Sequence, residues 1–251
     1  MSRSYSFRVP ASTSNLGAGF DALGLALDRY LRVNVEIETR TRRFAATSPK
    51  GRGPCEGVKH EIVVRGVDAA SIPTTSDNLS AALRGGLITA TESANGDVLI
   101  AKMQVADGVK PIVVIPAFEL STEKARAVLP QTYSRRDAVY NIQRSALTIA
   151  ALTTGNLLLL REAMRDRIHQ PYRAALIPGF EEILALNVPG LLGVALSGAG
   201  PTVFAFAKPA NAKSAGRAIA SVFEKHGVRA TPMAVNIDSE GRSIAEGELD
   251  L

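Results

Sequence analysis

The chain has 251 residues, of which 46% are hydrophobic, 21% charged and 5% aromatic. This composition is ordinary for a folded protein of mixed helix and sheet, and it excludes a disordered or collagen-like chain. The longest apolar stretch, residues 146–160, is interrupted by threonine, glycine and asparagine and is too short to span a membrane. We therefore expect a folded, water-soluble protein with one or two domains.

The net charge of +5 arises within the first sixty residues, which hold 10 basic and 5 acidic residues against 19 of each in the rest. A basic region suits either nucleic acid or a polyphosphate ligand. Its arginine cluster at residues 40–43 has no interleaved aromatic residues on which bases could stack, so we expect no nucleic-acid partner. The first ten residues contain no apolar signal segment and Cys55 is the only cysteine, which predicts a cytoplasmic protein without an internal disulfide or membrane anchor.

Alternating patterns dominate the first half of the chain. Apolar and polar residues alternate strictly over residues 31–38, which is typical of a half-buried antiparallel strand. The other elements expected here are a strand at 4–10, a glycine-rich loop at 15–21, a strand at 42–48, a helix at 59–70, a helix capped by Asp77 and ended by Gly85 and Gly86, and strands at 86–92 and 97–106.

From Pro111 onward, helical patterns with serine or asparagine caps alternate with short apolar runs. Apart from extra helices, their order is β-α-β-β-α-β, the ferredoxin-like arrangement. We therefore predict an α+β fold with two lobes, residues 1–108 and 109–251. The expected elements are strands at 112–115, 191–196, 202–207 and 229–236, and helices at 121–128, 134–153, 156–168, 179–187 and 211–226.

The loop at residues 15–21, N-L-G-A-G-F-D, follows the first predicted strand directly. Its glycines permit close approach of the backbone to a ligand, and Asn15 and Asp21 can recognise an ammonium or hydroxyl group. A purely structural turn remains an alternative. A dinucleotide-binding motif is disfavoured, because the loop leads into a strand rather than a helix.

Two further features suit an anionic ligand. The segment L-S-G-A-G-P-T at residues 196–202 has glycines whose amides can meet an anion, although a hairpin turn explains them equally well. Arg126 and Arg173 can bind a carboxylate or phosphate, although each alone is more often a surface charge. No Walker loop, protease, esterase or protein-kinase motif is present, and the three histidines lack metal spacing, which disfavours a zinc or copper enzyme.

Five segments resemble the homoserine kinase family of the GHMP small-molecule kinases. Residues 8–27, R-V-P-A-S-T-S-N-L-G-A-G-F-D-A-L-G-L-A-L, resemble its first motif, and residues 196–206 resemble its third. Residues 118–130, 133–141 and 169–179 are similar to stretches that mark this family within the superfamily. The resemblance is dispersed over most of the chain and is much more specific than any single glycine motif.

The resemblance implies phosphorylation of the L-homoserine side-chain hydroxyl by ATP with Mg²⁺, in threonine biosynthesis. It implies a ribosomal-protein-S5-like N-terminal lobe and a ferredoxin-like C-terminal lobe, with a homodimer as an open alternative. The family works by alignment of the reactants, so no catalytic base and no resident metal ligand is predicted. The substrate-binding residues implied are Asn15, Asp21 and Asn78 near the amino end of the substrate, Thr122, Arg126 and Arg173 near its carboxylate, and Gly198.

Two departures from the family pattern lie around residues 71–76, S-I-P-T-T-S. The Asp77-Asn78 pair follows Thr-Ser instead of the usual His-Pro, which removes a substrate-contacting histidine. The second family motif, a glycine- and serine-rich loop that holds the ATP phosphates, has no counterpart here. The sequence therefore predicts weak MgATP binding, and two alternatives stay open: an impaired amino-acid-binding relative, and another GHMP kinase with a different alcohol substrate.

Overall fold

The computed structural model describes residues 2–40, 59–65, 76–95 and 97–244. The predicted strand at 42–48 and the place of the missing phosphate loop, before Asp77, lie outside the described residues. The chain forms two compact units: residues 1–9, 30–72 and 242–251 make the first, and residues 10–29 and 73–241 make the second. The predicted lobe boundary near residue 108 stays a prediction.

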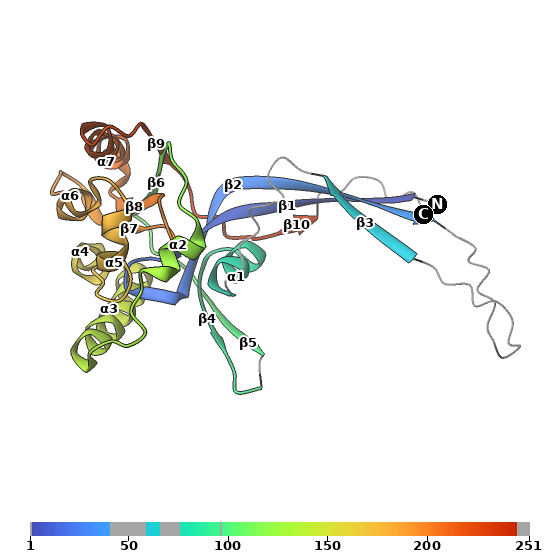
Figure 1. The fold of residues 1–251 in the computed structure, drawn as a ribbon, viewed down its shortest axis with the longest axis horizontal. Helices are drawn as coiled ribbons and strands as arrows, with labels where there is room; N and C mark the ends of the chain where they lie inside the picture. The colour runs from blue at the N-terminus through green and yellow to red at the C-terminus, as the bar shows by residue number, and fades with distance from the viewer. Residues whose placement is uncertain (1, 41–58, 66–75, 96, 245–251) are drawn as a thin grey trace, which may run out of the picture. The chain divides into compact units, whose positions relative to one another are not determined.

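Two long strands, β1 (Ser2–Asn15) and β2 (Gly19–Arg40), begin the chain (Figure 1). In the first unit, β10 (Ser243–Ile244) pairs antiparallel with β1, and β3 (Lys59–Arg65) pairs antiparallel with β2. The predicted antiparallel strand over residues 31–38 is thus confirmed as part of β2.

The predicted helix at 59–70 is wrong over its described part, because Lys59–Arg65 form β3. Its sequence, K-H-E-I-V-V-R, contains three consecutive β-branched residues, which fit a strand better than a helix. The partner strand decides the outcome, since Ile62 lies opposite Ile37 of β2 in an antiparallel ladder of hydrogen bonds.

In the second unit, β2 pairs antiparallel with β4 (Leu87–Glu92), and β4 pairs antiparallel with β5 (Val98–Met103). Helix α1 (Ser76–Arg84) packs closely on β2: a Cβ at Gly24 would lie 2.5 Å from the carbonyl oxygen of Asp77. The helix ends before Gly85, as predicted, but Asp77 lies inside its first turn rather than before it.

The second sheet has the antiparallel order β7-β8-β6-β9. Counted along the chain, this is the spatial order 2-3-1-4 of the predicted ferredoxin-like arrangement, which is therefore confirmed. Its strands are β6 (Lys110–Pro116), β7 (Leu191–Leu196), β8 (Val203–Ala207) and β9 (Ala230–Ala234).

Both faces of this sheet are covered. In β8, Val203 and Ala205 belong to a core shared with α6 (Phe180–Ala185) and α7 (Ala212–Lys225). Phe204 and Phe206 belong to a core shared with α3 (Arg135–Thr154) and α4 (Leu160–Ala163). Figure 1 shows α6 and α7 together on one side of β7 and β8. Covering on both faces explains why β7 and β8 are continuous apolar runs.

Helices α2 (Thr122–Ala127) and α3 (Arg135–Thr154) begin as predicted. The hydroxyl oxygens of Ser121 and Ser134 accept hydrogen bonds from the third backbone amide that follows, at 3.2 and 3.1 Å. These are N-cap bonds, which satisfy amides without an intrahelical partner.

The predicted single helix at 156–168 is wrong. The chain forms a short 3₁₀ turn at Leu157–Leu159, then α4 (Leu160–Ala163), an irregular segment, and α5 (Gln170–Arg173). The Asp166 carboxylate accepts hydrogen bonds from three backbone amides that follow it, at 2.6–3.0 Å. A short acidic side chain that bonds to nearby backbone amides competes with the helix, and here it takes the amides of residues 168–170, which a continuous helix would use.

Within the described residues, no helix has the length and apolar character required to cross a membrane.

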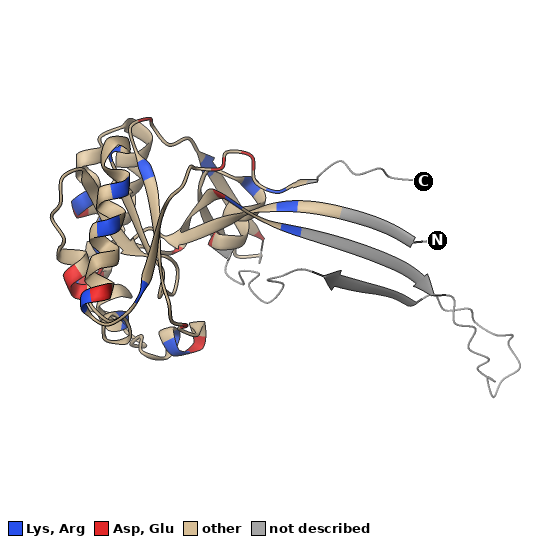
Figure 2. Cartoon of the chain, turned by 90° about the horizontal axis from the view of Figure 1, so that it is seen from above, with Lys and Arg blue, Asp and Glu red and all other residues tan. Residues whose placement is uncertain are grey.

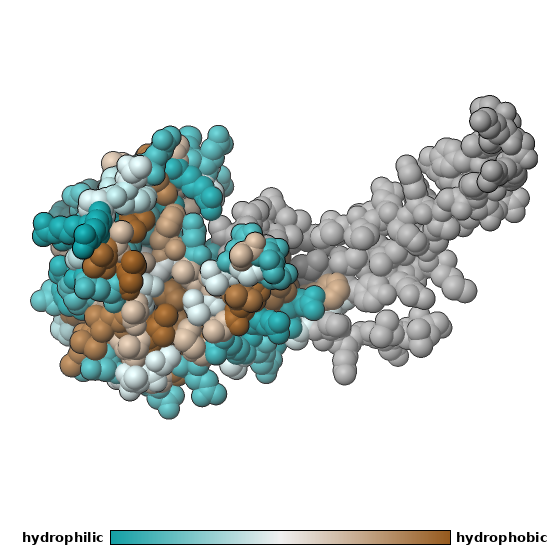
Figure 3. Space-filling model, turned by 90° about the horizontal axis from the view of Figure 1, so that it is seen from below, coloured by the Kyte–Doolittle hydropathy of each residue, from teal (hydrophilic) through white to brown (hydrophobic). Residues whose placement is uncertain are grey.

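Figure 2 shows charged residues mainly on helices and loops, while β7, β8 and β9 carry none. Figure 3 shows apolar residues among hydrophilic ones on the face seen from below. The exposed apolar side chains include Leu158 and Ile142, 74% and 68% accessible.

Candidate active site

The loop between β1 and β2 has an unusual backbone. Asn15, Leu16 and Asp21 have positive φ angles of 71°, 42° and 53°, which are uncommon for residues with a Cβ. The Leu16 side chain is fully buried in the core that includes Leu152 of α3, and this packing holds the loop in place. Strained backbone kept in this way is typical of ligand-binding sites.

Gly17 in this loop has no room for a side chain. Its φ is +84°, and an added Cβ would collide with the backbone of Met164. We expect Gly17→Ala to lower the free energy of unfolding by about 2 kcal/mol or more, from backbone strain and overpacking together. Gly227 has a similar φ of +78° and open space around it, so Gly227→Ala is the matched control in urea unfolding. Equal losses in both variants would contradict the collision.

Asn15 connects the loop to the β7–β8 connection. Its Oδ1 accepts a hydrogen bond from the Asp21 amide at 3.0 Å, and its Nδ2 donates to the Gly198 carbonyl at 2.9 Å. The Gly198 amide in turn donates to the Ser14 carbonyl at 3.2 Å. Three residues predicted as substrate-binding, far apart in the sequence, therefore lie together.

Asn78, in the first turn of α1, lies beside the end of β1. Its Nδ2 donates to the Ser14 hydroxyl at 2.9 Å, and its Oδ1 accepts from the Ser12 hydroxyl at 3.2 Å. A Cβ at Gly198 would approach Asn78 Nδ2 to 3.9 Å. The predicted Asn78 thus lies at the same site as the loop and Gly198.

Asp21, Arg126 and Arg173 form one electrostatic cluster. Asp21 is an exposed residue, but partial burial of its carboxylate removes water from it and raises its pKa. The charge of Asp77 raises this pKa further, whereas the charges of Arg126 and Arg173 lower it. Burial lowers the pKa of the Arg173 guanidinium, with Asp21 acting in the opposite direction and Arg126 in the same. The two guanidiniums therefore lie close enough to influence each other and the same carboxylate.

Arg173 is 2% exposed and is held by carbonyl oxygens. Its Nε donates to the Ala125 carbonyl at 3.0 Å, and its Nη1 donates to the Gly198 carbonyl at 3.1 Å. Among the described residues, Nη2 has no protein acceptor, which leaves one guanidinium nitrogen for a ligand. The bond to Ala125 ties Arg173 to α2, on which Thr122 and Arg126 are exposed.

Asp77 is an additional acidic residue, noticed in the sequence only as a helix cap. It is fully buried; its Oδ1 accepts from the Asn78 amide at 2.9 Å, and its Oδ2 meets no donor in the described part of the chain. A buried carboxylate oxygen without a partner is costly. Together with Asp21, it makes this part of the site favourable for a cationic group.

Asp166 and His169 are residues of this site that the sequence analysis did not identify. Asp166 fixes the segment before α5, and its Oδ1 also accepts from Asn141 Nδ2 at 2.6 Å. His169 contacts both the glycine-rich loop and Arg173. An aspartate shortly before a Gln-Pro pair is a signal for the start of a helix, because the carboxylate can accept from the first helical amides and proline is favoured in the first turn. This signal could have predicted the break between α4 and α5.

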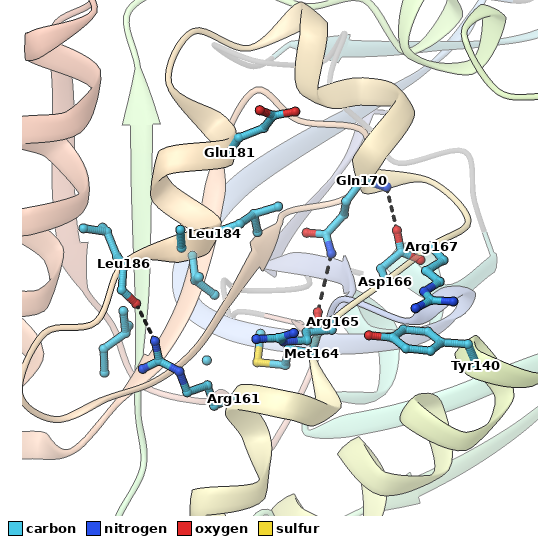
Figure 4. A pocket seen from close by; sticks show the side chains of 14 residues that line it. Tyr140, Arg161, Met164, Arg165, Asp166, Arg167, Gln170, Glu181, Leu184 and Leu186 are labelled. Atoms are coloured by element: carbon cyan, nitrogen blue, oxygen red, sulfur yellow. Dashed lines mark hydrogen bonds between the residues drawn. The ribbon is translucent and has the colours of Figure 1, made fainter. Parts of the chain in front are cut away.

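A separate cavity of about 490 Å³ lies beside Asp166 and Gln170 (Figure 4). None of the seven residues predicted as substrate-binding lines it. Two arginines that line it are already bonded to the protein: Arg161 donates to the Leu186 carbonyl, and Arg165 pairs with Glu162. We therefore do not assign the substrate to this cavity.

Within the described residues, no group of three or more histidine, cysteine, aspartate or glutamate side chains could hold a metal ion. The segment where the family places its phosphate loop, residues 70–76, is described only at Ser76. The described site thus contains groups for an amino acid, and no residue in it is assigned to Mg²⁺.

Comparison with known proteins identifies the family of this chain. Residues 148–225 match the family model "GHMP kinases C terminal". The chain is 35% identical to a homoserine kinase of Solibacter usitatus, over 80% of this chain and 84% of the relative. It is 34% identical to a homoserine kinase of Persephonella marina, over 94% of this chain and 97% of the relative.

The alignment with the Persephonella relative is 292 positions long, which exceeds the 251 residues of this chain. That relative therefore has internal segments without a counterpart here, consistent with a shortened chain.

Solved structures show the same fold. A homoserine kinase of Cytophaga hutchinsonii superposes with a TM-score of 0.78 at 20% identity, over 96% of this chain and 97% of that chain. A galactokinase of Lactococcus lactis superposes with a TM-score of 0.55 at 12% identity, over 96% and 95%. The predicted α+β fold of the GHMP kinases is thus confirmed. Given relatives more than 30% identical over at least four fifths of their length, the chain belongs to the homoserine kinase family of the GHMP kinases.

Proposed function

We propose that this chain transfers the γ-phosphoryl group of ATP to the side-chain hydroxyl of L-homoserine. The observation that carries this proposal is one cluster in which the carboxylates of Asp21 and Asp77 and the guanidiniums of Arg126 and Arg173 lie within electrostatic range of one another. An α-amino acid carries the complementary pair of charges. The family membership supplies the reaction class.

In the proposed complex, the substrate ammonium lies against Asp21 and the amide oxygen of Asn15. The substrate carboxylate accepts from Arg126 and from Arg173 Nη2, the guanidinium nitrogen that has no acceptor among the described residues. Charge-assisted hydrogen bonds of this type are the strongest that side chains make. Because Arg173 is held by two carbonyl oxygens and a histidine nitrogen, binding the carboxylate requires little reorganisation.

The chemical step forms a bond between the homoserine oxygen and the γ-phosphorus and breaks both the O–H bond of homoserine and the bond from the γ-phosphorus to the β–γ bridging oxygen. ADP and the hydroxyl proton leave. No strong base lies among the residues assigned here, so catalysis rests on alignment of the hydroxyl. Asn78, fixed by two serine hydroxyls, supports the proposed position of the substrate chain. Mg²⁺, implied by the family, would neutralise phosphate charge.

The direct test is ADP formation by the purified chain with MgATP and a panel of alcohols: L-homoserine, L-serine, L-threonine, mevalonate and galactose. Homoserine-dependent ADP formation, with O-phosphohomoserine identified by mass, supports the proposal. Homoserine binding without turnover would favour an impaired amino-acid-binding relative. A preference for a non-amino-acid alcohol would overturn the assignment.

We expect MgATP to bind weakly, with a Kd at or above about 1 mM, the upper end of ordinary substrate constants. The reason is the missing glycine- and serine-rich loop before Asp77, since loops of this type donate backbone amides and a helix dipole to phosphate. Calorimetric titration with a non-hydrolysable MgATP analogue measures this constant. Micromolar binding would show that other residues hold the triphosphate.

We further propose a cytoplasmic location and a product that enters threonine biosynthesis, because the family resemblance implies this pathway. A homodimer is the proposed assembly, and light scattering of the purified chain tests it.

A further inference from the structure

His169 lies in the interior of the site and is fully buried. Its Nε2 lies 2.8 Å from the Gly17 carbonyl oxygen, and its Nδ1 lies 3.1 Å from Arg173 Nη1. Its ring stacks on Phe20 with a centroid distance of 5.1 Å and an interplanar angle of 22°. This side chain therefore contacts both the loop that carries Asp21 and the arginine assigned to the substrate carboxylate.

The two partners determine the protonation state of the ring. A carbonyl oxygen only accepts, so Nε2 must carry a proton, and a guanidinium only donates, so Nδ1 must carry a lone pair. Both bonds are thus made only by the neutral imidazole with its proton on Nε2. A second proton on Nδ1 would face the Arg173 N–H directly.

The charged groups around His169 agree with the neutral form. Burial lowers the pKa of His169, and Arg173 acts in the same direction, whereas Asp166 and the bond to Gly17 raise it. Asp166 Oδ2 lies 3.7 Å from Nε2, beyond hydrogen-bond distance, and already accepts from two backbone amides (Figure 4 shows the bond to Gln170).

We propose that His169 is a positioning residue that sets the distance between the two ends of the amino-acid site. Its Nε2 proton holds the Gly17 loop, and with it Asp21, while its Nδ1 lone pair holds Arg173 at the orientation in which Nη2 remains available. This inference rests on the proposed function, because it assigns Asp21 and Arg173 to the two ends of one substrate.

Two conservative variants separate the two bonds. In His169→Gln, the amide nitrogen takes the place of Nε2 and keeps the bond to Gly17, but the acceptor for Arg173 is lost. In His169→Asn, the amide oxygen takes the place of Nδ1 and keeps the acceptor for Arg173, but the donor to Gly17 is lost. We expect each variant to raise the homoserine KM at least about tenfold, with the KM for ATP unchanged.

Substrate analogues identify which end is affected. 3-Aminopropan-1-ol lacks the carboxylate of homoserine, and 4-hydroxybutanoate lacks its ammonium. Loss of the Arg173 bond in His169→Gln should reduce the preference for homoserine over 3-aminopropan-1-ol. Loss of the loop bond in His169→Asn should reduce the preference over 4-hydroxybutanoate. A merely structural role would lower stability or kcat without this split, and equal effects on both preferences would overturn the proposal.

A spectroscopic measurement on the unmodified chain is independent of activity. With three histidines in the sequence, nitrogen-15 NMR resolves the ring nitrogens, and His60→Gln and His226→Gln assign those of His169 by elimination. We expect a neutral ring with its proton on Nε2 at pH 7. An imidazolium or an Nδ1-protonated ring would overturn the inference. Absence of any homoserine binding by a chain with the expected ring state would instead reject the proposed function, and with it the positioning role.

Discussion

Replacing Arg173 by lysine is expected to lower kcat/KM for homoserine by about 100-fold or more, the largest effect of any conservative change in the site. A lysine has a single nitrogen and cannot donate to Ala125, Gly198, His169 and a substrate carboxylate together. Breaking a buried charged network leaves its acceptors unsatisfied, which costs about 3–5 kcal/mol. Part of this cost falls on stability and part on substrate binding.

Thermal unfolding of the Arg173→Lys variant measures the loss of stability, and steady-state kinetics with homoserine measures the loss of substrate binding. Arg161→Lys is a suitable control, because Arg161 is exposed and lies in the other cavity. Arg126→Lys should have a smaller effect than Arg173→Lys, since Arg126 is exposed and no hydrogen bond preorganises it in the described structure. A homoserine KM unchanged in a folded Arg173→Lys variant would refute the assignment of this residue to the substrate carboxylate.

Asp21→Asn should weaken homoserine binding by about 1.5–3 kcal/mol, the range for a hydrogen bond to a charged group, or roughly 10- to 150-fold in Kd. The asparagine preserves the size of the side chain and removes only its charge, so the positive φ at this position is tolerated. Calorimetry with homoserine measures the loss. Asp107→Asn, at an exposed aspartate outside the site, controls for the general change in charge.

The same residue predicts a pH dependence. Because the pKa of Asp21 is raised, its carboxylate becomes protonated at a higher pH than an ordinary aspartate when the solution is acidified. The substrate ammonium needs the charged carboxylate, so the homoserine KM should rise as the pH falls toward that raised pKa. This acidic rise should be absent in Asp21→Asn. A KM profile identical in both proteins would show that Asp21 does not bind the ammonium.

Local patterns in the sequence predicted most of the second sheet and its helices. The strand at 191–196 was predicted with its observed bounds, because a short apolar run after Pro-Gly has few alternatives. The starts of α2 and α3 followed from Ser121 and Ser134, since an N-cap is a local hydrogen bond. The β-α-β-β-α-β order then predicted the observed strand arrangement.

The failures occurred where distant contacts outweigh local preference. Lys59–Arg65 form a strand because β2 supplies a partner. The paired residues lie 19 to 31 positions apart in the sequence, so a local pattern does not reveal the pairing. The irregular segment before α5 depends on the Asp166 carboxylate, which accepts hydrogen bonds from three backbone amides and from Asn141. Asp166 lies outside the quoted motifs, and His169 opens the 169–179 stretch, in which the sequence analysis singled out only Arg173.

The sequence alone determined the family and the residue types of the candidate site, since its motifs are local strings that survive without a structure. Only the tertiary structure decided that Asn15, Asp21, Arg173 and Gly198 lie together, and that His169 connects two of them. Hydrogen bonds with exact distance and direction depend on how the β1–β2 loop, α5 and the β7–β8 connection pack around Leu16 and Met164. Packing of this kind joins residues more than 150 positions apart, and no local periodicity encodes it.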